Sequence, residues 1–433
     1  MQNCRKERKK GRVLYPYLFA ILQFFLSAIP IAQTGPTLSK TDRDIVSTML
    51  RQIDDDLRRY YYDPTFHGVD LNATVHAATL KLETATGFND AIATLADLLI
   101  QLDDSHTTFM PPNRRVRVDY GWDMAMVGDV PLIISVEPGS DAAAKGIAAG
   151  DRVLMLNGFE PRRINLWRLA YFYRFIRPQA LQHVAVLKPD GSAANVDVQS
   201  RVENRPMTEI EDLLSELARL IHRMRDVSAA VGPDTLVWRM SVFGNPDRVD
   251  EMIKKARGYK TLVLDLRGNG GGAVAGLREL VSRCFDREVL VATVQHRAKL
   301  EREVAKPSRS GFTGRMIVLV DSRSASASEM FARIVQLEKR GIVIGDRTAG
   351  AVMTSRIIPH RVGPLGLFYA ISITIGDVRM SDGASLEHVG VQPDEPVLPT
   401  PADLAAGRDP VLAHAIALAG GRLTPEEAGA LFK

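Results

Sequence analysis

Cysteine is nearly absent from this chain, and so are the residue spacings of common metal sites. Only two of its 433 residues are cysteine, Cys4 and Cys284, and an apolar N-terminal segment separates them. We expect that segment to keep the two apart, so the fold must be stable without a disulfide. The chain also contains no His-x-x-x-His and no Cys-x-x-Cys pair. We therefore expect neither a metal site nor another cofactor.

Excess charge is lacking outside the first dozen residues. The formal net charge is +4, but residues 5–12 contain six basic side chains and one acidic side chain. The rest of the chain has 49 basic and 50 acidic residues, a net charge of −1. This balance gives no electrostatic reason to expect a nucleic acid as a partner.

The longest apolar run directly follows these basic residues. Residues 13–32 are apolar apart from Gln23 and Ser27. A basic head before an apolar body is typical of an export signal or of an N-terminal membrane anchor, and we assign residues 1–36 to one of the two. The length favours an anchor, whereas Pro16 and Pro30 shorten the helix, so both interpretations stay open. In either case we expect the bulk of the protein to be exported to the periplasm or another extracytoplasmic space.

The remaining chain has the composition of a soluble globular protein of several domains. The hydrophobic fraction is 45% and the charged fraction is 24%, and a length of this size predicts about two to four domains. Apolar residues at helical spacing predict a first helix from Lys40 to Tyr60, which Pro64 follows. Two more helices are predicted at 71–84 and 89–102.

The second of these helices leads into a short polar segment with a histidine. Asp103, Asp104, Ser105 and His106 follow one another directly. A lone histidine is more often structural than catalytic, but this one lies at a helix end among small polar residues, where an imidazole could face a cleft. Both interpretations stay open at this point.

Residues 116–202 are predicted to be mostly β-structure with two short helices. A strand at 131–136, a short helix at 141–145 and a strand closed by Asn157-Gly158 are expected, because Asn-Gly is a strong hairpin signal. The run from Gly146 to Gly158 closely resembles the middle of a PDZ domain. That resemblance implies capture of peptide C-termini at a sheet edge, with the carboxylate loop near Gly121 and Trp122. The loop sequence is degenerate, and the aromatic residues of the predicted helix at 162–177 suit either a groove or a core.

From residue 235 the chain alternates between strands and helices. Strands are predicted at 236–242, 260–266, 316–320 and 341–345, with helices at 247–256 and 274–284 and a further helix from Glu329. An amphipathic helix is predicted for 205–232. Alternating β and α elements with apolar strands indicate an α/β sheet covered by helices.

A glycine-rich turn at 267–272 lacks the Gly-x-Gly-x-x-Gly spacing and the Lys-Ser/Thr of a phosphate loop. Its bare amides would suit an oxyanion instead.

A cluster of serines follows the strand at 316–320. Ser324, Ser326 and Ser328 all lie where the chain turns from strand into helix. A helix N-terminus offers free N–H groups and the positive end of the dipole to a developing negative charge. The residues alone do not distinguish the three serines, and a simple N-cap explains the cluster equally well.

Taken together, these segments resemble the carboxyl-terminal processing protease and tricorn-core family of serine peptidases. The resemblance rests on residues 265–272, 322–331 and 345–350 in that order, and it extends to the segment around Ser105-His106. It implies an α/β fold with a crotonase-like β-β-α core, an N-terminal helical cap and an embedded PDZ domain. The implied domains are the cap at 37–115, the PDZ domain at 116–203, the peptidase core at 204–400 and a C-terminal helical tail at 401–433.

The same resemblance implies the site residues. Ser326 would be the nucleophile, but the position of the lysine that the processing-protease branch uses is Ala351, and no lysine occurs between Lys339 and Lys433. The tricorn-like branch uses a Ser-His pair and a glutamate, which Ser105-His106 and Glu387 match, so His106 would be the base. Ser105 or Glu387 would orient it, with Asp394 and Glu338 as the fallback carboxylates. The oxyanion would bind the amides of Ala327 and Gly271.

The leading hypothesis is an exported serine endopeptidase that cleaves extended or unfolded polypeptides through an acyl-enzyme. The alternative is a non-catalytic relative that binds a peptide or an apolar ligand on the same fold. A third reading, an acyl-CoA enzyme of the crotonase type, lacks any accompanying acyl-CoA signature.

Overall fold

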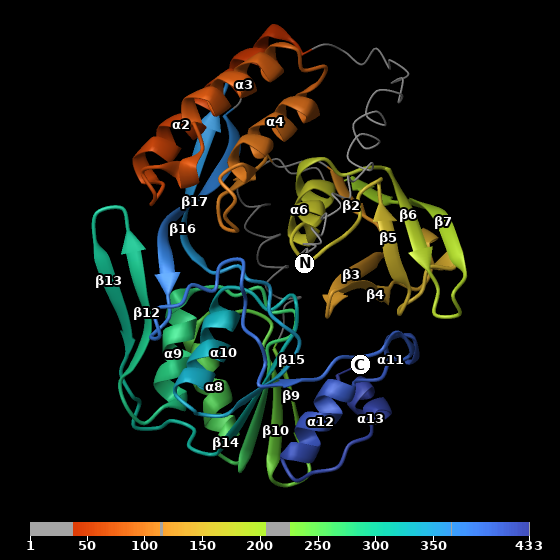
Figure 1. The fold of residues 1–433 in the computed structure, drawn as a ribbon, viewed down its shortest axis with the longest axis vertical. Coiled ribbons are helices and arrows are strands. Elements are labelled where there is room, and N and C mark those ends of the chain that lie inside the picture. Colours follow the sequence, from red (N-terminus) through yellow and green to blue (C-terminus); the bar gives the residue numbers. More distant parts are fainter. Residues whose placement is uncertain (1–37, 113–115, 205–225, 365, 433) are drawn as a thin grey trace, which may run out of the picture.

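A six-stranded sheet forms the centre of the lower half of the molecule (Figure 1). The computed structural model describes residues 38–112, 116–204, 226–364 and 366–432. The strands follow the order β18-β15-β14-β11-β10-β9, and all neighbours are parallel except β9 and β10. Their bounds are Glu395–Pro396 (β18), Ile342–Gly345 (β15), Arg315–Val320 (β14), Thr261–Asp265 (β11), Thr235–Arg239 (β10) and Val227–Val231 (β9). The inner strands read as continuous apolar runs because they are covered on both faces.

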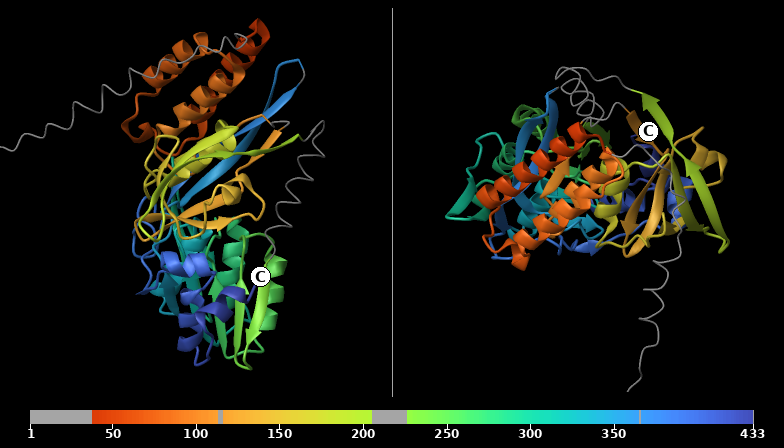
Figure 2. Two further views of the ribbon diagram at one scale, coloured as in Figure 1. Left: turned by 90° about the vertical axis from the view of Figure 1, so that its right-hand side faces the viewer. Right: turned by 90° about the horizontal axis from the view of Figure 1, so that it is seen from above.

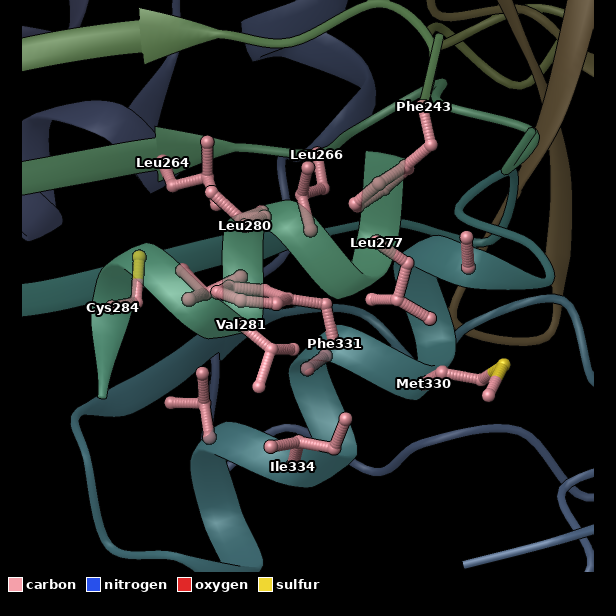
Figure 3. Close-up of a cluster of buried hydrophobic side chains, with 14 of the residues drawn as sticks. Phe243, Leu264, Leu266, Leu277, Leu280, Val281, Cys284, Met330, Phe331 and Ile334 are labelled. Atoms are coloured by element: carbon pink, nitrogen blue, oxygen red, sulfur yellow. The ribbon is translucent and has the colours of Figure 1, made fainter. Parts of the chain in front are cut away.

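One face of this sheet packs against the helices α8 (Pro246–Ala256), α9 (Val274–Cys284) and α10 (Ala327–Leu337). The close-up in Figure 3 shows Leu277, Leu280 and Val281 of α9 meeting Phe331 and Ile334 of α10 beside Leu264 of β11. These side chains are almost fully buried. Burying each one contributes about 1.5–3 kcal/mol to stability. This core fixes the start of α10, where Ser326 lies.

The opposite face is covered by the C-terminal helices α12 (Pro410–Leu418) and α13 (Pro425–Ala430), whereas α11 (Pro401–Ala406) lies beside Gly150. Val411, Leu412 and Ile416 of α12 pack on apolar strand residues such as Val263 and Ile317. An ion pair reinforces this contact, because Asp409 at the N-cap of α12 accepts two hydrogen bonds from Arg267 at 2.8 and 2.7 Å. The C-terminal segment is thus attached to the start of the glycine turn.

A second sheet connects the core to the N-terminal helices. It orders its strands β1-β17-β12-β13, and β16 pairs with β17 in a long antiparallel hairpin. The bounds are Thr108–Met110 (β1), Leu367–Arg379 (β17), Val289–His296 (β12), Leu300–Ala305 (β13) and Met353–Val362 (β16). Helices α2 (Lys40–Tyr60), α3 (Leu71–Glu83) and α4 (Phe88–Ile100) form a cap that shares its core with Tyr369, Ile371 and Ile373 of β17. Figure 2 shows this cap at the end of the molecule farthest from the C-terminal helices.

Residues 116–204 form a β module with a hydrophobic core of its own. Its five-stranded antiparallel sheet follows the order β3-β4-β5-β6-β7, and β2 pairs with β8. The bounds are Val116–Asp119 (β2), Trp122–Val127 (β3), Val130–Val136 (β4), Arg152–Leu156 (β5), Leu181–Leu187 (β6), Ala193–Gln199 (β7) and Arg201–Asn204 (β8). The short helix α5 (Asp141–Ala144) follows β4, and α6 (Leu166–Tyr171) continues into a π-helical turn η3 (Phe172–Ile176).

The structure confirms most of the predicted elements, shortens one helix and corrects another. The helices at 40–60, 247–256 and 274–284 and the strands at 131–136, 316–320 and 341–345 agree with it to within one or two residues. The helix predicted for 162–177 is shorter, at 166–176. The helix predicted for 205–232 is wrong over its described part, because residues 227–231 form β9 and pair with β10. The predicted leader, residues 1–36, lies outside the described residues. No helix within the described ranges is long and apolar enough to cross a membrane.

Candidate active site

Ser326 occupies a strained turn between β14 and α10. Its backbone has φ 53° and ψ −115°, which is uncommon for a residue with a side chain. The turn is held by Glu329, whose Oε2 accepts the Ser326 N–H at 3.0 Å. The same N–H donates to the Ala351 carbonyl at 2.9 Å. Such strain persists only where the surroundings fix the backbone, and it presents the Ser326 side chain at the start of α10.

The three serines that the sequence could not separate have different surroundings. Ser324 and Ser328 are both 0% exposed. The Ser324 hydroxyl donates to the Leu266 carbonyl at 2.8 Å, and the Ser328 hydroxyl donates to the Asn269 carbonyl at 2.9 Å. Ser326 alone of the three keeps part of its surface open. Only Ser326 is therefore accessible to a reactant.

Glu329 is a buried carboxylate that connects the serine turn to residues 348–351. It accepts hydrogen bonds from the Thr348 hydroxyl at 2.6 Å and from the N–H groups of Gly350 at 2.7 Å and Ala351 at 2.9 Å, besides that of Ser326. Burial raises its pKa to about 7, and these four donors counteract part of that rise. Its role was missed by the sequence reasoning, although Ser326-x-x-Glu329 has the spacing of a capping box.

The glycine turn lies against Ser326. Gly271 has φ +98°, and a Cβ placed on it would come within 2.7 Å of Ser326 Cβ and 3.1 Å of the Ala327 nitrogen. The Gly271 N–H donates to the Asn269 side-chain oxygen at 2.9 Å. The N–H of Ala327 has no acceptor among the described residues. Both residues predicted for the oxyanion thus lie beside Ser326, but one of the two amides is engaged.

Asn269 joins the glycine turn to the serine turn. Its backbone carbonyl accepts the Ala325 N–H at 3.0 Å and the Ser328 hydroxyl at 2.9 Å, and its side-chain amide donates to the Met240 carbonyl at 2.9 Å. Asn269 is 0% exposed, so these bonds are shielded from water. No local sequence pattern marks Asn269 as part of a site.

Glu387, Ser105 and His106 form a continuous hydrogen-bonded chain. Glu387 accepts the Ser105 N–H at 2.8 Å and the Ser105 hydroxyl at 2.9 Å. The Ser105 oxygen lies 2.7 Å from His106 Nδ1. The Ser105 hydroxyl has one proton, and it donates this proton to Glu387. The proton in the hydrogen bond between Ser105 and His106 must therefore belong to the histidine, and we assign it to Nδ1. The neutral imidazole then has its lone pair on Nε2, the form that can accept a proton.

The electrostatics favour that neutral form. Burial lowers the pKa of His106, and the Asp104 carboxylate raises it by a smaller amount. For Glu387, burial raises the pKa, and the hydrogen bonds from Ser105 and from the Val352 N–H, at 2.7 Å, counteract it. A neutral histidine beside a hydrogen-bonded carboxylate is the arrangement of a general base.

Residues 350–352 connect the two halves of the candidate site. On one side, Ala351 accepts the Ser326 N–H and donates to Glu329; on the other, Val352 donates to Glu387, which holds Ser105. Two consecutive residues thus link the serine turn to the segment that carries His106. Within the described residues no hydrogen bond joins the His106 ring to the Ser326 hydroxyl.

The fallback carboxylates lie elsewhere in the hydrogen-bond network. Asp394 accepts the Val343 N–H of β15 at 2.8 Å and the Gln336 amide at 2.9 Å. Glu338 pairs with Arg287 at 2.6 Å. Neither bonds to Ser105 or His106 in the described chain. Among the described residues no group of three or more His, Cys, Asp or Glu side chains is arranged to hold a metal ion.

The two residues predicted to bind a peptide lie at the edge of the β module. Gly121 has φ +69°, and its N–H donates to Asp119 at 3.0 Å. Trp122 begins the edge strand β3 and is 9% exposed. The far end of β3 reaches the core, since the Met126 carbonyl accepts the Ser322 hydroxyl at 2.6 Å. The module therefore contacts the core four residues before Ser326.

The model of peptidase family S41 matches residues 234–397. These residues form a peptidase family S41 domain. The predicted family and enzyme class, a serine-type peptidase, are confirmed. The S41 domain contains the glycine turn, Ser326 and Glu387, whereas Ser105 and His106 precede it.

Similarity beyond the S41 domain extends over most of the chain. A carboxyl-terminal-processing protease from Picosynechococcus sp. is 25% identical over 329 residues, which are 71% of this chain and 73% of that protein. The crystal structure of mature CPAF matches with a TM-score of 0.63 at 15% identity, covering 85% of this chain and 95% of that one. The photosystem II D1 C-terminal processing protease matches with a TM-score of 0.51 at 17% identity, over 84% and 94%. The two structures support the mixed α/β fold.

Proposed function

We propose that this protein is a serine endopeptidase whose nucleophile is Ser326 and whose general base is His106. The observation that carries the proposal is the chain from Glu387 through Ser105 to His106, which residues 351 and 352 link to the Ser326 turn. A serine hydroxyl needs a base to become a nucleophile near neutral pH, and this chain supplies one without a lysine.

The reaction follows from these positions. His106 Nε2 takes the Ser326 Oγ proton as that oxygen attacks the peptide carbonyl carbon, and the resulting imidazolium is stabilised through Ser105 by Glu387. The tetrahedral intermediate collapses when His106 gives the proton to the leaving amine, which leaves an acyl-enzyme on Ser326. A water molecule, deprotonated by the same histidine, then hydrolyses the ester.

The oxyanion would bind the free N–H of Ala327 and the N–H of Gly271. The close packing of Gly271 against Ser326 supports its choice as the second donor. Its N–H must turn from the Asn269 side chain, or be shared with it, when the negative charge develops. The dipole of α10 adds to this stabilisation.

The remaining parts of the proposal concern the architecture and the substrate. We assign residues 116–203 to a PDZ domain, 204–400 to a crotonase-like peptidase core, 37–115 to the helical cap and 401–433 to the helical tail. The separate hydrophobic core of the β module supports the assignment of residues 116–203 to a domain of their own.

The substrate class is an extended or unfolded polypeptide, since similar proteins are named carboxyl-terminal-processing and tail-specific proteases. Export to an extracytoplasmic space is proposed from the leader alone.

Hydrolysis of a mixed peptide library tests this function. The wild type should cleave peptides, whereas Ser326→Ala and His106→Ala should each lower the rate to background. Ser324→Ala and Ser328→Ala are the controls, because both hydroxyls are buried and bonded to carbonyls. Full activity of Ser326→Ala would contradict the assignment.

A non-catalytic binding protein is the second candidate. The observation that favours it is the lack of a hydrogen bond between His106 and Ser326 in the described residues, although catalytic hydrogen bonds are often longer in the free enzyme. A binding protein would retain peptides without cleaving them. Binding by the wild type that is equal to that of Ser326→Ala, with no product in either sample, would favour this candidate.

A further inference from the structure

Asp104 is a buried carboxylate directly before Ser105 and His106. It is 1% exposed and accepts four hydrogen bonds. Oδ1 binds the N–H of His106 at 2.9 Å, the N–H of Thr107 at 2.7 Å and the Thr374 hydroxyl at 2.6 Å. Oδ2 accepts the Tyr61 hydroxyl at 2.8 Å. Four donors and no acceptors around both oxygens suit the ionised form of the carboxyl group.

None of these four partners is a cation. Buried carboxylates are usually paired with a positive charge, because hydrogen bonds alone offset only part of the cost of removing the charge from water. The imidazole of His106 can become cationic, and the Asp104 carboxylate raises its pKa against the effect of burial. A second imidazole, that of His67, lies farther out, with its ring centroid 5.8 Å from that of Tyr61 and its Nδ1 2.9 Å from the Leu102 carbonyl. The negative charge of Asp104 therefore gains a cationic neighbour when His106 takes up a proton.

We propose that Asp104 is a positioning residue for the peptidase reaction, which fixes the backbone of His106 and stabilises its imidazolium. The inference rests on the proposed function of His106. Asp104 binds the His106 backbone while the chain from Glu387 binds the ring. The two carboxylates therefore act on the same residue by different routes.

Three elements meet at this carboxylate. Tyr61 comes from the end of α2, Thr374 from β17, and the two amides from the turn before β1. Thr374 is held in place by the Thr107 hydroxyl, which donates to it at 3.1 Å. The cap and the second sheet thereby fix the position of a charge that acts on His106.

Other titratable groups face the same region. Asp103 lies on the same turn and pairs with Arg168 of α6, and its side chain is 62% exposed. Glu387 and His388 approach from the loop after β17, where His388 Nε2 lies 2.8 Å from the Asp103 carbonyl. Tyr62 and Asp377 also surround these carboxylates. Asp103 provides a natural control, because it adjoins Asp104 but its charge is exposed and already paired.

The test compares pH profiles of kcat/KM for the wild type, Asp104→Asn and Asp103→Asn. Asparagine preserves the shape of the side chain, accepts the same three bonds on its oxygen and donates its amide to Tyr61, so Asp104→Asn removes mainly the charge. We expect its plateau to fall about 10- to 100-fold and its acid limb to move to lower pH by about half a pH unit or more. Asp103→Asn should leave the acid limb in place. An unchanged acid limb in folded Asp104→Asn would overturn the inference.

Two further measurements keep the outcomes distinct. If His106→Ala retains activity, the proposed function fails; if His106→Ala is inactive and Asp104→Asn has the wild-type acid limb, only this inference fails. Should Asp104→Asn not fold, the wild-type acid limb is measured at about 0.05 and 0.5 M salt. A buried carboxylate is poorly screened, so the limb should stay constant. A clear shift with salt would assign the effect to exposed charges and overturn the inference.

Discussion

Glu387 holds Ser105 by two hydrogen bonds, one from the backbone N–H at 2.8 Å and one from the hydroxyl at 2.9 Å. The two residues lie in different parts of the sequence, one before the β module and one near the end of the S41 domain. Because the Ser105 hydroxyl donates to Glu387, it must accept from His106 Nδ1, and this sets the tautomer of the histidine. Glu387 therefore controls His106 through an intervening serine.

Replacing Glu387 by glutamine should weaken this chain. With its oxygen in the place of Oε2, glutamine still accepts from the Ser105 hydroxyl and the Val352 N–H, but its amide then faces the Ser105 N–H and that bond is lost. The negative charge that stabilises the His106 imidazolium through Ser105 is removed as well, so we expect kcat to fall by roughly 10²–10⁴-fold. The check is steady-state hydrolysis of a peptide substrate, with Asp394→Asn as the control. A larger loss of kcat in Asp394→Asn than in Glu387→Gln would contradict the order of the chain.

The pKa of Glu329 makes stability depend on pH. Burial raises it from its ordinary value of 4.5 to about 7, so the folded protein holds this proton more tightly than the unfolded chain does. The resulting stabilisation is fully present below pH 4.5 and is lost as the pH rises through about 7, a difference on the order of 3 kcal/mol. Glutamine cannot ionise, so Glu329→Gln should flatten this slope. Urea unfolding of both proteins at several pH values between 4 and 8 measures the difference. Parallel curves would show that another group is responsible.

Gly271 and its neighbour Gly270 offer a matched pair of substitutions. A Cβ at Gly271 would lie 2.7 Å from Ser326 Cβ and 2.9 Å from the Ala325 carbonyl oxygen, and the backbone has φ +98°. A Cβ at Gly270 would meet nothing within 4 Å. We expect Gly271→Ala to lose at least roughly 100-fold in kcat, the usual effect of disturbing an oxyanion donor, while Gly270→Ala keeps most of its activity. Kinetics on the two purified variants test this, and similar losses in both would argue against the tight contact.

The ion pair between Arg267 and Asp409 should contribute to global stability. Although burial raises the pKa of Asp409, the Arg267 guanidinium outweighs this effect and lowers it. Asp409→Asn leaves a buried arginine with only Asp265 as its partner, so we expect a loss of about 3 kcal/mol in the free energy of unfolding. The control is Glu160→Ala, which breaks an exposed pair with Arg162 and should have no measurable effect. Urea unfolding midpoints of the wild type, Asp409→Asn and Glu160→Ala measure these changes in stability.

Local sequence patterns predicted the elements whose periodicity is strong. The helix at 274–284 was predicted with its observed bounds, because its apolar residues repeat at helical spacing and Gly272 ends the preceding turn. Residues 227–231 were assigned to a helix because short runs of alanine and valine are ambiguous. Their conformation is set by pairing with β10, a contact that local patterns do not reveal. The long hairpin of β16 and β17, which supports the cap, was not predicted either.

The candidate site also combines residues that the sequence predicted with residues that only the structure identifies. Ser326, His106, Ser105 and Glu387 were predicted from a family resemblance, but the residues alone left three serines equivalent. Burial separates them, since Ser324 and Ser328 are enclosed and bonded to carbonyls. Asn269, Glu329 and Asp104 act through hydrogen bonds to other elements, and of these only Glu329 had a local signal. The roles of these residues follow from contacts between distant segments, which local sequence patterns do not show.

The most direct test of the central claim is to label the protein with a reagent for active-site serines and locate the modified residue by mass spectrometry. We predict a single adduct on Ser326, which is lost in Ser326→Ala and forms much more slowly in His106→Ala. An adduct on Ser324 or Ser328, or an undiminished labelling rate in His106→Ala, would contradict a Ser326 nucleophile activated by His106.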